Sequence, residues 1–503
     1  MDLTSPAITA VKTYIQDHWG KLTRSHTDLV AAAYDEKVAH EQNGTWPVYI
    51  SGQEDIEQVT ETLKQSVPKA DLEQITIQPL PLEADQCTSH GLLYLPGDYV
   101  VPGGRFNELY GWDAYFIMVG LMHDQRYTLA KSMVDQLLYQ VKHYGTVLNA
   151  NRTYYLNRSQ PPLLSRMVLR WFDHAQDLDW LKQILPELES YYYYWMVPPH
   201  LNQSTGLSHY FAAGEGPAPE VLYSERDDQG RTHFDRIKDF YRTHEVTDYD
   251  VSWYYDPDTD QLNELFYRGD RSMRESGLDP TNRFGPFSID VVHYAPVCLN
   301  VLLYQMEKDL AHIYQQLGHA DMVDRWCDKA AYRKTLINRY LWDEESGFYL
   351  DYNFRESCRR PYDYATTFYP LWAGLASPHQ AQRLVENLPK LEAPGGLRTS
   401  NFVSGNQWDA PFGWAPLQYF GIKGLLHYGH KPEALRLAEK FVTLLVNDFD
   451  RCGVLLEKYD VDRCSGDLTG QIKFGYSTNE VGFGWTNGVF LELIGILEQE
   501  RGK

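Results

Sequence analysis

Wherever this 503-residue chain shows a regular pattern, its apolar residues mostly recur with the spacing of an α-helix. Within residues 130–141 they stand at i, i+3, i+4, i+7, i+8 and i+11, and the pattern stops before Gly145, a residue type that commonly ends helices. A second pattern begins at Pro432, which suits the first turn of a helix. Similar spacing predicts further helices near residues 163–173, 181–196, 295–318, 322–341 and 488–499. Strand-like alternation is scarce and residues 74–78 are too few to define a sheet, so the sequence predicts an all-α solenoid or toroid.

The division of the chain into parts is less marked, because no Ser- or Gly-rich linker interrupts it. Residues 1–90 carry weaker helical patterns than the rest of the chain. We therefore expect residues 91–503 to form the main body and residues 1–90 to form an N-terminal extension packed on it.

Composition excludes several classes of protein. The chain has 46 Lys and Arg residues against 68 Asp and Glu, a net charge of −22 that repels nucleic-acid phosphates and anionic lipid. No stretch approaches the roughly 18 apolar residues that a membrane helix needs, and the first residues lack the apolar core of a signal peptide. Six cysteines lie far apart, without the paired spacing of zinc ligands. We expect a cytoplasmic protein with no metal, cofactor, nucleic-acid or membrane partner.

Polar and aromatic residues gather in the segments that separate the predicted helices. Aromatic residues make up 14% of the chain, and tryptophan stands directly before aspartate at Trp112–Asp113 and at Trp408–Asp409. An aromatic ring can pack on the apolar face of a sugar while a neighbouring carboxylate accepts its hydroxyl groups. Segments of this kind occur at residues 102–113, 149–162, 274–284, 407–416 and 482–487. Their similar chemistry predicts one funnel-shaped sugar site at one end of a toroid.

Several of these segments resemble the trehalase family. Residues 102–113 (PGGRFNELYGWD) and 407–416 (QWDAPFGWAP) resemble its two signature segments, and residues 151–162 and 482–488 resemble further conserved blocks. The similarity extends from about residue 95 to 495, and the segment around Asp279 is most similar to the neutral trehalases of fungi. This resemblance implies an (α/α)6 barrel and the inverting hydrolysis of α,α-trehalose to two glucose molecules.

Two other functions remain open at this point. One is the hydrolysis of a different small α-glucoside, such as a glucosylated glycerol or glycerate, because only the leaving-group part of the pocket would differ. The other is a catalytically weak protein that binds trehalose.

The resemblance makes Asp279 the catalytic acid. Inverting hydrolysis needs a protonated carboxyl group at the glycosidic oxygen and a carboxylate about 6.5–9.5 Å away that activates water. An aspartate that donates a proton near neutral pH needs a raised pKa, which a nearby arginine opposes. We therefore expect Arg274 and Arg283 to point at sugar hydroxyls or at other carboxylates.

The resemblance also implies a set of residues that contact the sugar. One arginine of many bacterial and insect trehalases is replaced here by Ala218, and Arg274 is expected to supply its charge. Arginine and carboxylate side chains suit neighbouring hydroxyl groups because they form charge-assisted hydrogen bonds. The expected contacts are Arg105, Phe106, Trp112, Asp113, Asn149, Arg158, Gln160, Glu220, Arg274, Trp408 and Glu457.

The catalytic base is the point at which the sequence departs from the family. Trehalases carry it between a Glu-Lys-Tyr block and a Phe-Gly-Trp block, present here at Glu457 and Phe483. Counting from the first block reaches Lys473, and counting back from the second reaches Tyr476, neither of which is a carboxylate.

Three carboxylates of this region are candidates for the base. Glu480 lies nearest to the expected position and is taken as the base, with Asp467 and Glu457 as the alternatives. If none of them reaches the water, the chain is a slow hydrolase, a phosphorylase that binds phosphate through Lys473, or a sugar-binding protein.

Overall fold

Helices dominate the computed structural model, which describes residues 2–38, 44–81, 87, 89–224, 226–227, 229–476 and 478–501. The helices predicted from apolar spacing are confirmed. α6 (Tyr127–Tyr144) ends at Gly145, whose φ of 81° only glycine adopts without strain. α18 (Lys431–Cys452) has Pro432 in its first turn and ends at Gly453 in the same left-handed conformation. No helix among the described residues is long and apolar enough to cross a membrane.

Six helices of the described residues form a closed inner ring. Each packs against the next, and the last packs against the first. α5, α13 and α17 are buried on nearly all sides, as expected for helices surrounded by others. The inner helices are α5 (Asp113–His123), α7 (Leu164–Ala175), α13 (Val297–Gln316), the short α15 (Tyr369–Trp372), α17 (Ala415–His427) and α19 (Gly484–Arg501).

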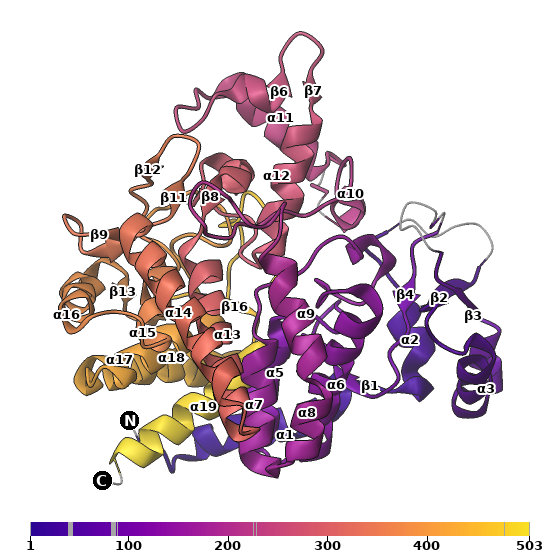
Figure 1. The fold of residues 1–503 in the computed structure, drawn as a ribbon. Coiled ribbons are helices and arrows are strands. Elements are labelled where there is room, and N and C mark those ends of the chain that lie inside the picture. The colour runs from indigo at the N-terminus through magenta and orange to yellow at the C-terminus, as the bar shows by residue number, and fades with distance from the viewer. Residues whose placement is uncertain are drawn as a thin grey trace.

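An outer layer surrounds this ring (Figure 1), and α5, α13 and α17 are each followed in the chain by an outer helix that packs against them. α1 (Pro6–Leu22) supplies one further outer helix, since it packs against α18 and α19. The fold is therefore the all-α toroid that the apolar spacing predicted, and it is the (α/α)6 barrel that the resemblance implied. The other outer helices are α6, α8 (Leu178–Gln183), α9 (Leu185–Trp195), α14 (Ala320–Tyr340), α16 (Pro378–Asn387) and α18.

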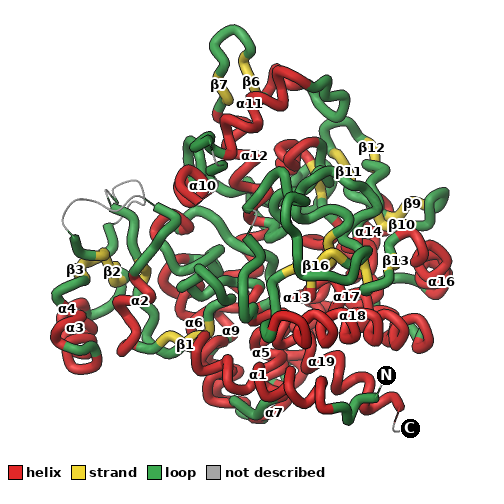
Figure 2. Tube along the Cα trace, turned by 180° about the vertical axis from the view of Figure 1, so that it is seen from behind, coloured by secondary structure: helices red, strands yellow, loops and turns green. Residues whose placement is uncertain are grey.

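A small three-stranded sheet lies at one side of the barrel (Figures 1 and 2). β2 (Trp46–Ile50) pairs in parallel with β3 (Ile75–Pro79) and β4 (Leu92–Leu93). The expectation that residues 74–78 define no sheet is therefore wrong, because the partners of this strand lie far away in sequence. The division at residue 90 stays a prediction, although α1 belongs to the outer layer. Three short helices accompany the sheet, α2 (Leu29–Ala33), α3 (Ile56–Ser66) and α4 (Lys69–Leu72).

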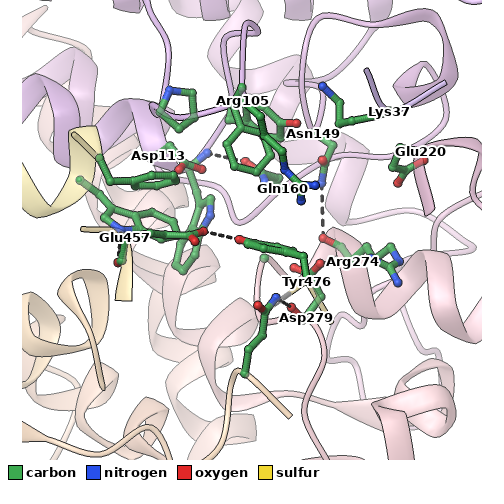
Figure 3. Close-up of a pocket in the computed structure, with 18 of the residues that line it drawn as sticks. Lys37, Arg105, Asp113, Asn149, Gln160, Glu220, Arg274, Asp279, Glu457 and Tyr476 are labelled. Carbon is green, nitrogen blue, oxygen red and sulfur yellow. Dashed lines mark hydrogen bonds and ion pairs between the residues drawn. The ribbon is translucent and has the colours of Figure 1, made fainter. Parts of the chain in front are cut away.

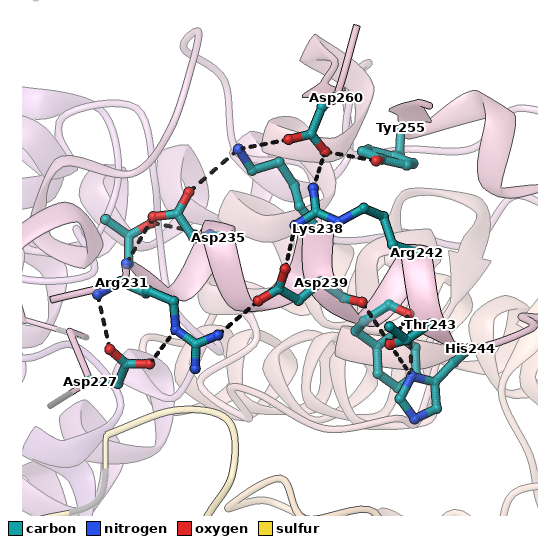
Figure 4. Close-up of polar contacts among 12 residues, drawn as sticks. Asp227, Arg231, Asp235, Lys238, Asp239, Arg242, Thr243, His244, Tyr255 and Asp260 are labelled. Atoms are coloured by element: carbon teal, nitrogen blue, oxygen red, sulfur yellow. Dashed lines mark hydrogen bonds and ion pairs between the residues drawn. The ribbon is translucent and has the colours of Figure 1, made fainter. Parts of the chain in front are cut away.

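A segment before α12 (Glu264–Glu275) projects from the barrel (Figure 1). It has its own apolar cluster, which includes Phe234 and Ile237 of α11. Ion pairs such as Arg231–Asp239 lie on the outer side of α11 (Figure 4). Because both side chains are more than 40% exposed, water screens these pairs and they contribute little to stability. The apolar cluster is the main support of this segment. Its elements are α10 (Pro219–Ser224), α11 (His233–Thr243), β6 (Tyr255–Asp256) and β7 (Gln261–Leu262).

Short strands connect the loops at one end of the barrel. β15 (Phe412–Trp414) pairs antiparallel with β16 (Lys458–Asp460), which places Trp414 opposite Lys458. This pairing brings the segment at residues 407–416 next to Glu457. The remaining strands are β1 (Thr23–Arg24), β5 (Tyr99–Val100), β8 (Tyr294–Ala295), β9 (Trp342–Asp343), β10 (Phe348–Tyr349), β11 (Tyr352–Asn353), β12 (Cys358–Arg359), β13 (Glu392–Ala393) and β14 (Gly396–Leu397).

Candidate functional site

The predicted loops meet in one cavity at an end of the barrel (Figure 3). The cavity measures about 720 Å³ with its open mouth. All predicted site residues except Arg158 and Glu480 line it. Those lining residues are Arg105, Phe106, Trp112, Asp113, Asn149, Gln160, Glu220, Arg274, Asp279, Trp408 and Glu457.

Three tryptophans form an apolar wall of the cavity. The ring of Trp112 lies 6.0 Å from that of Trp408 and 5.8 Å from that of Trp485. Trp408 is fixed by stacking on Trp414, with ring centroids 3.8 Å apart. Gly277 touches this wall with a φ of +71°, and an added Cβ would lie 2.9 Å from Trp112 Cε2, so only glycine fits there.

Hydrogen bonds between neighbouring loops fix the polar wall. The backbone N–H of Trp112 donates to Gln160 Oε1 at 2.8 Å. Asn149 donates from Nδ2 to the carbonyl of Arg274 at 3.3 Å, which ties the loop at 149 to the end of α12. Glu220 forms an ion pair with Arg158. Arg158 does not line the cavity itself but holds Glu220, which does. Its contact with a sugar stays a prediction.

Asp279 follows α12, and its backbone is held by the second tryptophan-bearing loop. Gln407 donates from Nε2 to the Asp279 carbonyl at 2.5 Å, and the Trp408 N–H donates to the Pro280 carbonyl at 3.1 Å. These bonds join two segments more than a hundred residues apart and place the Asp279 side chain, 28% exposed, at the cavity.

Arg274 and Arg283 were both expected to point away from Asp279. Arg283 does so, and Arg274 does so only in part. Arg283 forms a bidentate pair with Asp351, with both N···O distances 2.6 Å, and is buried away from the cavity. Arg274 pairs with Asp270, Nε to Oδ2, at 3.1 Å, but its Nη1 also lies 3.5 Å from Asp279 Oδ2. The expectation that Arg274 avoids Asp279 is therefore wrong in part. Both residues leave the same helix end, which brings them together.

Asp409 supports the loop that follows Asp279. It is fully buried, and burial raises its pKa to about 6 although several hydrogen bonds oppose the rise. Thus the loop depends on a carboxylate that is costly to ionise. Its donors are the hydroxyls of Thr281, Tyr362, Ser400 and Ser404 and the backbone N–H of Asn282.

Asp409 predicts a pH dependence of stability. Because its folded-state pKa of about 6 lies above the ordinary 3.8, its contribution is fully present below pH 3.8 and is lost as the pH rises through about 6. The loss amounts to ~3 kcal/mol at neutral pH. We compare the free energy of unfolding of the wild type with that of Asp409→Asn at each pH. The wild-type value minus the variant value is expected to fall by ~3 kcal/mol between pH 4 and pH 7.5. Urea unfolding followed by tryptophan fluorescence measures it, and a difference that does not vary with pH contradicts the assignment.

Glu457 is a buried carboxylate of the cavity wall, and two side chains donate hydrogen bonds to it. Its side chain is 1% exposed. The Tyr476 hydroxyl donates to Oε1, and Lys458 Nζ donates to Oε2 at 2.9 Å. Burial lowers the pKa of Lys458, and the negative charge of Glu457 and its hydrogen bond oppose that change. Burial also raises the pKa of Tyr476, and the charge of Glu457 adds to the rise.

Four carboxylates line the cavity, Asp113, Glu220, Asp279 and Glu457. Burial raises the pKa of Asp113 well above its usual range, and the charges of Glu457 and Asp279 raise it further. In Figure 3, Glu457 and Asp279 lie on either side of the Tyr476 ring. A carboxyl group with a raised pKa in a cavity that holds further carboxylates is typical of acid–base sites.

The other two candidates for the base lie outside this arrangement. The Glu480 carboxylate accepts the Arg105 N–H at 3.1 Å and the Thr478 hydroxyl at 2.9 Å, and it does not line the cavity. Asp467 is exposed and binds Thr469 at the surface. Lys473, the expected phosphate ligand, is also exposed and outside the cavity.

Several lining residues were not singled out from the sequence. Lys37 comes from the N-terminal region and is held by Glu108 at 2.7 Å and Asp35 at 3.1 Å, a contact that no local motif signals. Phe483, Trp485 and Gln407 belong to segments in which the sequence predicts the site, although the resemblance assigns no contact to these three residues. The further lining residues are Pro102, Tyr110, Tyr155, Gly277 and Tyr476.

Solved structures share this fold. Neutral trehalase Nth1 from Saccharomyces cerevisiae matches with a TM-score of 0.81 and 32% identity, covering 98% of this chain and 94% of that chain. A mannosylglycerate hydrolase from Thermus thermophilus matches with a TM-score of 0.52, covering 79% of this chain and 95% of that one, and at 17% identity it shows the fold alone.

Sequence comparisons point to one family. A family model described as Trehalase matches residues 7–498. The cytosolic neutral trehalase of Kluyveromyces lactis is 38% identical over 78% of this chain and 55% of its own length, and that of Neurospora crassa is 37% identical over 78% and 57%. The chain spans about half the length of the curated relatives that it matches. Because the family model matches nearly its whole length, the chain belongs to the trehalase family.

Proposed function

We propose that the chain is an inverting glycoside hydrolase that cleaves α,α-trehalose into two glucose molecules. The observation that carries this proposal is a single cavity in which Asp279 and Glu457 share a tryptophan-walled space of about 720 Å³. The names of the similar neutral trehalases support trehalose as the substrate.

In the proposed mechanism, Asp279 donates its proton to the glycosidic oxygen. Water attacks the anomeric carbon from the opposite side and passes a proton to Glu457. The carbon–oxygen bond breaks, one glucose leaves with the α configuration and the other is formed as the β anomer. Glu457 replaces Glu480 as our choice of base because it lines the cavity and Glu480 does not.

The other polar groups of the cavity are proposed to bind sugar hydroxyls. Arg274, Arg105 and Glu220 offer charged hydrogen-bonding groups there. Asp113, whose pKa is raised, is proposed to stay protonated and to donate to a hydroxyl. The aromatic side chains Phe106, Trp112 and Trp408 supply apolar surface for the two rings.

Tyr476 is proposed to hold Glu457 in its productive orientation. The Tyr476→Phe substitution keeps the aromatic ring, whose centroid lies 4.5 Å from Arg105 Cζ. It removes the hydroxyl that donates to Glu457 Oε1. We expect kcat for trehalose to fall about tenfold with little change in KM, since one hydrogen bond that orients the base is removed. Initial rates of glucose release measure this, and a KM effect without a kcat effect would instead assign Tyr476 to substrate binding.

A substrate panel tests the proposed function. Trehalose, glucosylglycerol and glucosylglycerate are each incubated with the protein, and released glucose is measured. Trehalose is expected to be cleaved with the highest kcat/KM. Cleavage of another glucoside with trehalose left intact would contradict the substrate assignment, and calorimetric binding of trehalose without any glucose release would favour the binding protein.

We propose that the protein acts in the cytosol. The support is that the relatives from Kluyveromyces lactis and Neurospora crassa are named cytosolic neutral trehalases.

A further inference from the structure

A second cavity opens at the other end of the barrel. α17 begins next to Trp414, which stacks behind the sugar cavity, and ends at His427, which lines the second cavity. The second cavity measures about 1220 Å³ with its open mouth and is lined by residues of α5, α7, α13 and α17 and of the end of α15.

An aromatic layer separates the two cavities. The hydroxyls of Tyr115 and Tyr419 are hydrogen-bonded at 2.7 Å on the side of the second cavity. The Phe116 ring packs against Trp112 at 5.7 Å and against Tyr419 at 5.7 Å. A ligand in the second cavity would therefore not touch Asp279 or Glu457.

Four cationic side chains line the second cavity, which is unexpected in a chain with a net charge of −22. They are Arg166 and Arg170, one turn apart on α7, Lys308 on α13 and Lys423 on α17. The one acidic residue of its lining is the exposed Asp173.

The carboxylates that balance these cations lie behind them. Asp309 accepts Arg166 Nη1 at 2.8 Å, and its side chain is 2% exposed. Glu492 accepts Arg170 Nη2 at 3.2 Å and Lys423 Nζ at 2.8 Å, and its side chain is 7% exposed. Neither carboxylate lines the cavity, so the guanidinium and ammonium groups face its space.

Lys308 completes this cationic lining. Its ammonium group donates to the backbone carbonyl of Ala373 at 3.2 Å, not to a carboxylate. Burial lowers the pKa of Lys308, the charge of Asp309 opposes that change, and the charges of Arg166 and Lys334 add to it. Because Lys308 has no carboxylate within ion-pair distance among the described residues, a bound anion would offset the cost of burying its charge.

We propose that this second cavity binds a phosphorylated hexose. Arginine and lysine bind phosphate oxygens through charge-assisted hydrogen bonds, which the four cations can provide. The space is much larger than a phosphate ion, and Tyr115, Tyr419 and Trp372 add aromatic surface of the kind that packs on a sugar ring. Because the cavity offers groups for both the phosphate and the sugar ring, we expect it to bind a sugar phosphate more tightly than free sugar or inorganic phosphate.

Calorimetry on the full chain tests this proposal with glucose 6-phosphate, glucose and inorganic phosphate as probes. Asp279→Asn is used as the background so that trehalose can be added without turnover. We expect glucose 6-phosphate to bind at least about tenfold more tightly than glucose or phosphate, and more weakly at high salt. Excess trehalose should leave this binding unchanged.

Variants locate the binding at the second cavity. Lys308→Glu should weaken glucose 6-phosphate at least about tenfold, because it reverses one of the four charges. Lys142→Glu, the same change on an exposed lysine of α6, should have no effect. In the otherwise wild-type chain, Lys308→Glu should keep normal trehalose turnover, which shows that the fold is intact. Equal binding of phosphate alone, displacement by trehalose, or indifference to Lys308→Glu would each overturn the proposal.

Discussion

Asp279→Asn is expected to lower kcat for trehalose by about 10²–10⁴-fold, the range typical of the loss of a general acid. Asparagine keeps the shape of the side chain but has no acidic proton to give to the glycosidic oxygen. The backbone bonds from Gln407 to Asp279 and from Trp408 to Pro280 do not involve the carboxyl group, so the loop should keep its position. Initial rates of glucose release and calorimetric binding of trehalose measure the two expectations.

Asp467→Asn is the matched control for this change. Asp467 is an exposed aspartate that binds Thr469, and the same substitution there should leave kcat within about twofold of the wild type. If Asp279→Asn turns trehalose over at the wild-type rate, Asp279 is not the acid. If it abolishes trehalose binding instead, its role is substrate contact.

Glu457→Gln is expected to lower kcat by about 10²–10⁴-fold, because glutamine does not accept a proton from the attacking water. The change also removes the charge that faces the buried Lys458 ammonium, 2.9 Å away, so a loss of stability is expected too. A readout that depends on chemistry and not on folding is therefore needed.

Azide provides that readout for the Glu457→Gln variant. Azide is already an anion and needs no base, so it attacks the anomeric carbon from the side that water would use. The bond from carbon to nitrogen forms, the glycosidic bond breaks, and the leaving glucose takes its proton from Asp279. We expect azide to restore turnover and to yield β-glucosyl azide, identified by NMR.

Glu480→Gln distinguishes Glu457 from the base expected from the sequence. Glu480 accepts from the Arg105 backbone and from Thr478 outside the cavity, so its loss should lower kcat less than about tenfold and azide should have no effect. A large loss that azide rescues in Glu480→Gln, with Glu457→Gln active, would reverse our assignment of the base.

The helices predicted from the sequence, among them α6 and α18, were predictable because each carries its own apolar period, whereas α5 and α17 are buried on nearly all sides and were not predicted. The pattern at residues 130–141 ends at Gly145 for a local reason, the left-handed conformation of that glycine. The parallel sheet was missed because β3 pairs with β2 and β4, which lie far away in sequence. No local pattern in five residues reveals partners of that kind.

The cavity was predictable for a different reason, the resemblance of its loops to trehalase segments. That resemblance did not identify the base, because Tyr476 stands where a carboxylate was expected. The position of Glu457 depends on the pairing of β15 with β16 and on the Trp485 indole, which donates to the Glu457 carbonyl at 3.0 Å. Glu480 instead fills the space above Gly104, where a Cβ would lie 1.9 Å from its Oε2.

Proton NMR of the products of trehalose turnover tests the central claim most directly, namely that Asp279 and a water activated by Glu457 act on opposite faces of one glucose ring. The spectrum is recorded at early times, before the anomers of free glucose equilibrate. Our account predicts α- and β-glucose in equal initial amounts, since the leaving glucose keeps its configuration and the attacked one inverts. Release of α-glucose alone, or of glucose 1-phosphate when phosphate is present, would contradict it.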